Sequence, residues 1–169
     1  SEEDVAKLEV KDPAKLAYLT QTTLSVDETT VIIDALKQRF PEMRGPARED
    51  ICYATTNRQA AVKELAAKCD LVLVVGSPTS SNSSRLREVA ELYGATSYLV
   101  ESVHDVDPTW LDGKNSIGVT AGASTPEHLV SELVQWLEAR GAAPASDLVA
   151  VAETMFFHLP SDLAKDLAD

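Results

Sequence analysis

Residues 71–82, LVLVVGSPTSSN, decide the fold. The first five are apolar and branched without interruption, which is typical of a strand buried on both faces of a parallel sheet. The remaining seven contain almost no apolar side chain and are predicted to form a loop. Residues 85–93 then follow at helical spacing, and Gly94 marks their end. The stretch therefore predicts a strand, a polar loop and a helix in succession.

Similar units follow downstream. Residues 98–100 and 116–120 are predicted strands, and the second leads into Thr125 as a predicted N-cap with Pro126 at the first helical position. The helix that begins there is expected to reach about residue 140.

The chain upstream of the central stretch carries the same signals more weakly. Residues 15–20 are predicted to form a short strand, and Ser25 and Glu28 have the spacing of a capping box at the start of a helix. Residues 52–56 are expected to form a loop, with Asn57 as the cap of the next helix.

Repeated strand-loop-helix units predict an α/β fold with a parallel sheet. The breaker-rich segment PEMRGP, residues 41–46, is the predicted internal boundary. We therefore expect an incomplete unit over residues 1–45, a complete α/β lobe over residues 46–141, and a linker with a closing tail over residues 142–169. Within that tail, residues 149–159 are predicted to form a last strand.

Composition narrows the class of function. The chain has 169 residues, with 15 basic and 27 acidic side chains and a formal charge of -12, which argues against binding to nucleic acid. No apolar run reaches the length of a membrane span. Two cysteines are too few for a disulfide scaffold, so a cytoplasmic location is expected.

Three polar loops precede predicted helices: residues 21–23 (QTT), 80–82 (SSN) and 122–124 (GAS). Helix N-termini offer free amide donors and the positive end of a dipole, and hydroxyl groups add donors without charge. Because the loops are expected at one edge of the sheet, they predict a site for a diphosphate or a similar small anion. The alternative is that these side chains only cap helices, which is their commonest role.

Cys52 lies in ICYATTNRQ, residues 51–59, at the entrance to a predicted helix. A thiol near a helix N-terminus is acidified, which suits a nucleophile or a ligand to a soft metal. A purely structural cysteine is the alternative, and Cys69, beside the buried strand, is predicted to be one.

Four segments, QTTLS, DICYATTNRQ, LVLVVGSPTSSNSSRL and GVTAGASTPEHLV, occur in an order and spacing that resemble the C-terminal half of the 4-hydroxy-3-methylbut-2-enyl diphosphate reductases. The resemblance covers nearly the whole chain. It implies an enzyme of three α/β lobes around a 4Fe-4S cluster held by one cysteine per lobe. Such an enzyme reductively dehydrates an allylic alcohol diphosphate to isopentenyl and dimethylallyl diphosphate, with electrons from ferredoxin or flavodoxin.

The resemblance also implies roles for single residues. Cys52 would be the cluster thiolate of the last lobe, and Thr22 would contact the substrate near its hydroxyl and help to deliver a proton. Thr55 would line the same pocket. The diphosphate would be bound by Ser80, Ser81, Asn82 and Ser124, which lie in loops already selected above.

Two further cluster cysteines, the diphosphate-binding histidines and the proton-donating glutamate belong to the family's N-terminal half. We therefore expect this chain to be part of a larger enzyme whose missing half completes the site, and to hold no stable cluster and no activity alone. A non-catalytic α/β domain that binds diphosphate or another small anion is the alternative. A structural domain with ordinary helix caps is the third possibility.

Overall fold

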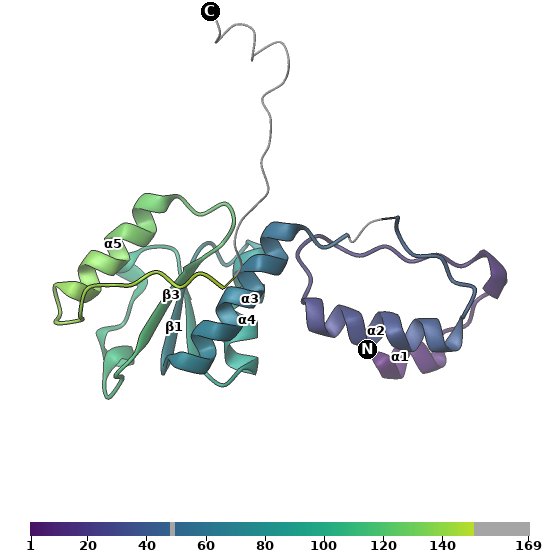
Figure 1. Cartoon of the computed structure of the whole chain (residues 1–169), viewed down its shortest axis with the longest axis horizontal. Helices are drawn as coiled ribbons and strands as arrows, with labels where there is room; N and C mark the ends of the chain where they lie inside the picture. Colours follow the sequence, from purple (N-terminus) through teal and green to yellow (C-terminus); the bar gives the residue numbers. More distant parts are fainter. Residues whose placement is uncertain (48–49, 151–169) are drawn as a thin grey trace, which may run out of the picture.

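The computed structural model describes residues 1–47 and 50–150. Figure 1 shows the elements spread along one axis, with the sheet and its helices towards one end and two packed helices at the other. In chain order these elements are α1 (Glu2–Lys7), α2 (Val26–Arg39), α3 (Tyr53–Lys68), β1 (Leu71–Val75), α4 (Ser81–Leu92), β2 (Thr96–Val100), β3 (Ile117–Ala121) and α5 (Glu127–Glu138). Short 3₁₀ helices occupy Pro13–Lys15, Val103–Asp105 and Pro108–Leu111.

The sheet has three parallel strands in the order β2-β1-β3, which confirms the predicted α/β class. The central strand β1 is buried along its whole length, as its unbroken apolar sequence predicts. Val75 is opposite Val100 in β2 and Ala121 in β3, so all three strands end at the same edge of the sheet. The loops that leave this edge carry the candidate site.

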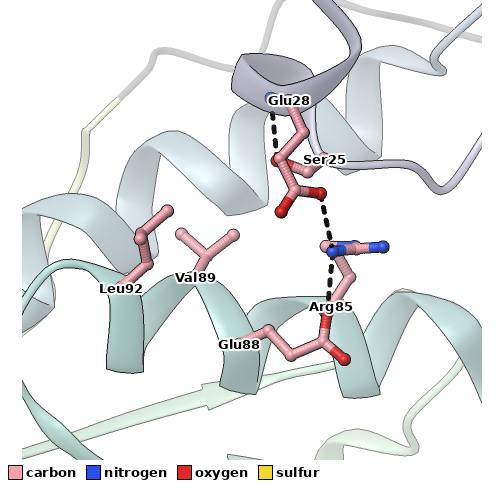
Figure 2. Close-up of a pocket in the computed structure, with 6 residues that line it drawn as sticks. All are labelled: Ser25, Glu28, Arg85, Glu88, Val89 and Leu92. Atoms are coloured by element: carbon pink, nitrogen blue, oxygen red, sulfur yellow. Dashed lines mark hydrogen bonds and ion pairs between the residues drawn. The ribbon is translucent and has the colours of Figure 1, made fainter. Parts of the chain in front are cut away.

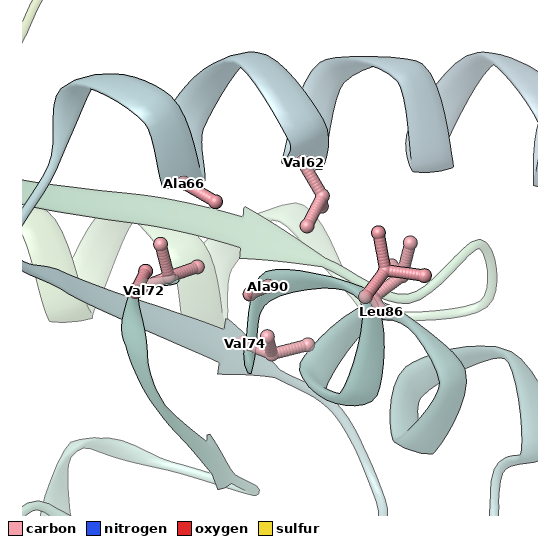
Figure 3. Packing of buried hydrophobic residues seen from close by; sticks show 8 residues of the cluster. Val62, Ala66, Val72, Val74, Leu86 and Ala90 are labelled. Atoms are coloured by element: carbon pink, nitrogen blue, oxygen red, sulfur yellow. The ribbon is translucent and has the colours of Figure 1, made fainter. Parts of the chain in front are cut away.

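Helices cover both faces of the sheet because successive side chains of β1 point to opposite sides. Val72 and Val74 face α3 and α4, where Figure 3 shows them packed against Val62 and Leu86. Leu71, Leu73 and Val75 face α5 on the other side. Burying a side chain of this size contributes about 1.5–3 kcal/mol, so β1 is the centre of the stability of this lobe.

Residues 1–45 are arranged differently. Helices α1 and α2 pack on each other and lie beyond α3, away from the sheet (Figure 1). Val5, Ser25 and Phe40 are the buried side chains of this segment, while Leu19 is 82% exposed and Val31 47% exposed. These residues therefore form two helices and connecting segments without a core of their own.

Two sequence predictions in the N-terminal half are wrong. Residues 15–20 are not a strand: the 3₁₀ helix Pro13–Lys15 begins the segment, and a single parallel bridge joins Ala17 to Arg44. An extended segment needs a neighbouring strand to become a sheet, and one bridge does not supply it. Asn57 does not cap α3, because Cys52 is its N-cap and the helix includes the threonines that follow.

The boundaries of other elements shift in the same way. Helix α4 begins at Ser81, four residues before the predicted start, because Ser80 caps it. Thr125 is not a helix cap: its hydroxyl donates to the Val75 carbonyl at 2.9 Å, and Pro126 is the N-cap of α5. The predicted closing strand over residues 149–159 lies almost entirely outside the described residues. None of the described helices combines the length and apolarity needed to cross a bilayer.

Candidate functional site

The site lies where the sheet reverses its winding direction. Helix α4 follows β1 on one face, and α5 follows the neighbouring strand β3 on the opposite face. Adjacent parallel strands whose helices cross to opposite faces leave a crevice at their carboxyl ends, where ligands of α/β proteins bind. Here the edge carries the loop after β1 and the loop after β3.

Two glycines bring these loops together. A Cβ atom added at Gly76 or at Gly122 would lie 2.2 Å from the hydroxyl oxygen of Ser83, whose side chain is 1% exposed. The N–H group of Gly122 donates to the Val75 carbonyl at 3.0 Å. Any larger residue at either glycine would push the loops apart, so both glycines are required by close packing rather than by backbone freedom.

Asn82 is the unusual residue of the loop after β1. Its side chain is 7% exposed, and neither its amide nitrogen nor its oxygen has a hydrogen-bond partner among the described residues. An unpaired buried amide costs about 1–3 kcal/mol and is rare in folded proteins. Asn82 lies in the first turn of α4, where backbone donors and the helix dipole favour an anion.

The neighbouring serines have different environments. The hydroxyl of Ser80 accepts the Ser83 N–H at 3.3 Å and so caps α4. Ser80 therefore has the capping role that the alternative interpretation of these loops predicts. Ser81, the first residue of α4, and Ser124, in the loop after β3, are exposed. Of the four residues predicted to bind diphosphate, Asn82 is the one whose buried polar atoms lack a hydrogen-bond partner among the described residues.

Cys52, Thr55 and Thr22 form a second group. The Cys52 sulfur lies 3.1 Å from the Thr55 hydroxyl, and the Cys52 N–H donates to the Thr22 carbonyl at 3.3 Å. The Thr55 hydroxyl, followed by the backbone N–H groups of Thr55 and Ala54, holds the pKa of the half-buried Cys52 thiol below its ordinary value, although burial opposes the shift. Thr55 is buried, and the Thr22 side chain is exposed.

Helix α3 carries this second group to the edge where the loops lie. Its last turn leads through Cys69 and Asp70 into the start of β1, so α3 runs back along the sheet towards the carboxyl end of that strand. With 16 residues it spans about 24 Å, whereas the five residues of β1 span about 17 Å, so its first turn lies beyond the sheet edge. Among the described residues, no hydrogen bond joins Cys52, Thr22 or Thr55 to the serine loops.

A protein-family model described as LytB protein matches residues 1–138, which is most of the chain. The chain belongs to the LytB protein family.

Curated relatives of this LytB family member are named 4-hydroxy-3-methylbut-2-enyl diphosphate reductase. The one from Marinobacter nauticus is 52% identical over 168 residues, covering 99% of the chain and 53% of the relative. The one from Dechloromonas aromatica is 56% identical over 161 residues, covering 95% of the chain and 53% of the relative. The chain therefore spans about half the length of the curated relatives it matches.

A solved structure agrees with the fold. The E-1-hydroxy-2-methyl-but-2-enyl-4-diphosphate reductase from Plasmodium falciparum superposes with a TM-score of 0.77 at 33% sequence identity. This match covers 98% of the chain and 53% of that structure.

A groove of about 340 Å³ lies beside the site, between the start of α2 and the length of α4 (Figure 2). Arg85 crosses it, with ion pairs to Glu28 at 3.1 Å and to Glu88 at 2.7 Å. Both carboxylates are already paired with the Arg85 guanidinium, and their negative charges would repel a bound phosphate group. The groove is therefore part of the contact between α2 and the LytB lobe and not a second place for diphosphate.

Sequence reasoning missed the roles of three residues that shape the site, although it had named Thr125 as a helix cap. Ser83 packs against both glycine loops, Thr125 ties the loop after β3 to β1, and Gln59 joins α3 to the loop that carries Thr22. Ser83 continues the polar run of the loop, which could have indicated it, but the long-range partners of Thr125 and Gln59 leave no local pattern.

Within the described residues, no group of three or more His, Cys, Asp or Glu side chains is placed to hold a metal ion.

Proposed function

We propose that this chain is a part of a 4-hydroxy-3-methylbut-2-enyl diphosphate reductase. The overall reaction adds two electrons and two protons to the allylic alcohol diphosphate, breaks the carbon–oxygen bond to its hydroxyl, and releases water. Isopentenyl and dimethylallyl diphosphate are the products. The observation that carries the proposal is Asn82, a buried amide with no partner among the described residues, which lies at a helix N-terminus beside the topological switch point of the sheet.

The diphosphate is proposed to bind at this edge of the sheet. The Asn82 amide would donate to a phosphate oxygen and so satisfy its buried nitrogen, with the hydroxyls of Ser80, Ser81 and Ser124 as further donors. The N–H groups in the first turn of α4 that Ser80 does not cap would add to them. Neutral hydrogen-bond donors suit this chain, because acidic side chains outnumber basic ones and the formal charge is -12.

Cys52 is proposed to hold one iron of a 4Fe-4S cluster. Its partly buried thiol, with a pKa lowered by the Thr55 hydroxyl, fits a soft-metal ligand. When bound, such a cluster would supply the two electrons, with ferredoxin or flavodoxin in the cytoplasm as their source. Two further cysteines would come from outside these 169 residues, since Cys69 is at the opposite end of α3.

Thr22 is proposed to contact the substrate hydroxyl and to pass a proton to it. Its side chain is exposed at the edge where Cys52 lies, and its own carbonyl accepts the Cys52 N–H. In the complete protein, residues 1–45 would belong to one lobe and residues 46–141 to the next. The small number of buried side chains in residues 1–45 supports this division.

The decisive experiment uses a polypeptide of the relatives' full length that contains this sequence. Asn82→Leu should raise KM for the diphosphate substrate by at least about tenfold, because a charge-assisted hydrogen bond contributes about 1.5–3 kcal/mol. Asn115→Leu, at an exposed asparagine on the far side of the lobe, is the matched control and should leave KM unchanged. Equal KM values for the two variants would refute the assignment of Asn82.

The cluster assignment needs its own measurement. Cys52→Ser should abolish the broad visible absorbance of the anaerobically purified full-length protein, and Cys69→Ser should retain it. The 169-residue chain alone should acquire no such absorbance from iron and sulfide. Diphosphate binding that depends on Asn82, without reduction of the substrate by the full-length protein, would favour a non-catalytic binding domain instead.

A further inference from the structure

Helix α3 buries one stripe of side chains: Thr55, Gln59, Val62 and Ala66. Their spacing places them on a single face of the helix. Val62 and Ala66 belong to the apolar core, but Gln59 is a polar residue that is only 1% exposed. A buried amide is tolerated when both its donor and its acceptor are satisfied, so the partners of Gln59 reveal its task.

Both partners of Gln59 lie on the segment that leads from Thr22 into α2. Its amide nitrogen donates to the Leu24 carbonyl at 2.8 Å, and its amide oxygen accepts the Val26 N–H at 3.0 Å. These bonds join residues more than 30 positions apart in the chain. Val26 is the first residue of α2, so its N–H has no partner within the helix.

The same segment is held at a second point. The Cys52 N–H donates to the Thr22 carbonyl at 3.3 Å. Cys52 and Gln59 are seven residues apart, or about two helical turns, so both face the segment from one side of α3. The main chain of residues 22–26 is thus attached to α3 at both of its ends.

We infer that Gln59 is a positioning residue that holds the Thr22 segment beside Cys52. It acts through the main chain of the segment and contacts neither substrate nor cofactor. The inference rests on the proposed function in one respect, namely that Thr22 and Cys52 serve the reaction. The competing explanation is that Gln59 only caps α2, together with Ser25, whose hydroxyl accepts the Glu28 N–H at 3.4 Å.

The geometric part is tested on the 169-residue chain by amide hydrogen exchange. Gln59→Met keeps the length of the side chain and removes both hydrogen bonds. The amides of Val26 and Cys52 should then exchange about tenfold faster, while those of β1 should not change. Gln135→Met is the matched control, since Gln135 is exposed in the middle of α5. Val26 and Cys52 exchange rates equal to those of this control would overturn the inference.

The functional part is tested in the full-length protein. Gln59→Met should lower kcat about tenfold and leave KM for the diphosphate substrate unchanged, because the diphosphate loops are attached to other elements. Faster exchange with an unchanged kcat would make Gln59 only a cap of α2 and overturn the positioning role. If the wild-type full-length protein reduces no substrate, the proposed function fails, and the exchange rate of Cys52 still decides whether Gln59 holds the segment.

Discussion

The lobe that contains the sheet with α3, α4 and α5 and the segment formed by residues 1–45 are stabilised by different forces. In the lobe, every residue of β1 is buried, whereas in the segment no residue of α2 is buried. The segment is instead attached to the lobe through polar contacts, among them Asp27 with Lys63 and Glu28 with Arg85. The difference teaches that apolar residues at helical spacing make no core unless a second packed surface, here the sheet, covers them.

Leu73→Ala should give the largest loss of stability. Leu73 is fully buried at the middle of β1, so truncation should cost about 2–5 kcal/mol in the free energy of unfolding. Val31→Ala in α2, where the side chain is 47% exposed, should cost less than about 0.5 kcal/mol. Denaturant unfolding followed by tryptophan fluorescence measures both, because Trp110 and Trp136 pack against the cluster that contains Leu73. Similar losses for the two variants would remove the contrast between the regions.

The two cysteines extend the comparison to chemical reactivity. Cys52, where the two regions meet, has its pKa lowered first by the Thr55 hydroxyl, whereas burial, followed by the charge of Asp70, raises the pKa of Cys69 within the lobe. In the metal-free chain at neutral pH, Cys52 should therefore be alkylated several-fold faster than Cys69. Thr55→Val should slow only the reaction at Cys52. Mass spectrometry of timed alkylation measures both rates, and faster labelling of Cys69 would contradict this expectation.

Lys63→Met should have a smaller effect, confined to the contact between the regions. Lys63 lies 2.7 Å from Asp27, and the pair is partly exposed, so its loss should cost at most about 1 kcal/mol. A double-mutant cycle with Asp27→Asn isolates the coupling between the two side chains. Additive effects of the two substitutions would mean that the ion pair does not join the segment to the lobe.

The coupling of this pair should vanish at both extremes of pH. The hydrogen bond from Lys63 lowers the pKa of Asp27, so its contribution is present above the ordinary carboxyl pKa and is lost as pH falls through the lowered value. Burial opposes the charge on Lys63, but Asp27 and Tyr93 outweigh it and raise the Lys63 pKa. That contribution is present below the ordinary lysine pKa and is lost as pH rises through the raised value. Repeating the double-mutant cycle across pH measures the loss of the coupling energy at low pH and at high pH.

Arg87→Ala should produce the smallest change of all. Its ion pair with Glu91 lies within the lobe at 3.3 Å, with both side chains more than a third exposed. Such pairs contribute less than about 0.5 kcal/mol and weaken with salt. Unfolding at low and high salt measures this contribution. A loss comparable to that of Leu73→Ala would mean that surface charge, and not the core, stabilises the lobe.

The sequence could predict those elements whose signals are local. The unbroken apolar run of residues 71–75 predicts a central strand, and Ser25 with its capping-box spacing predicts the start of α2, where its hydroxyl accepts the Glu28 N–H. The order of the four family motifs predicts the family. In contrast, the local preference favours Asn57 as the cap of α3, because Asn is a common N-cap and Cys is not, yet the helix begins after Cys52.

The tertiary structure decided which side chains meet. Asn82 has the same local pattern as an ordinary capping residue, and only the packing of α4 on the sheet leaves its amide buried without a partner among the described residues. Gln59 has no local signal, because both of its partners are more than 30 residues away. Hydrophobic pattern and capping act within a few residues of one another, whereas burial and long-range hydrogen bonds exist only after distant segments have packed.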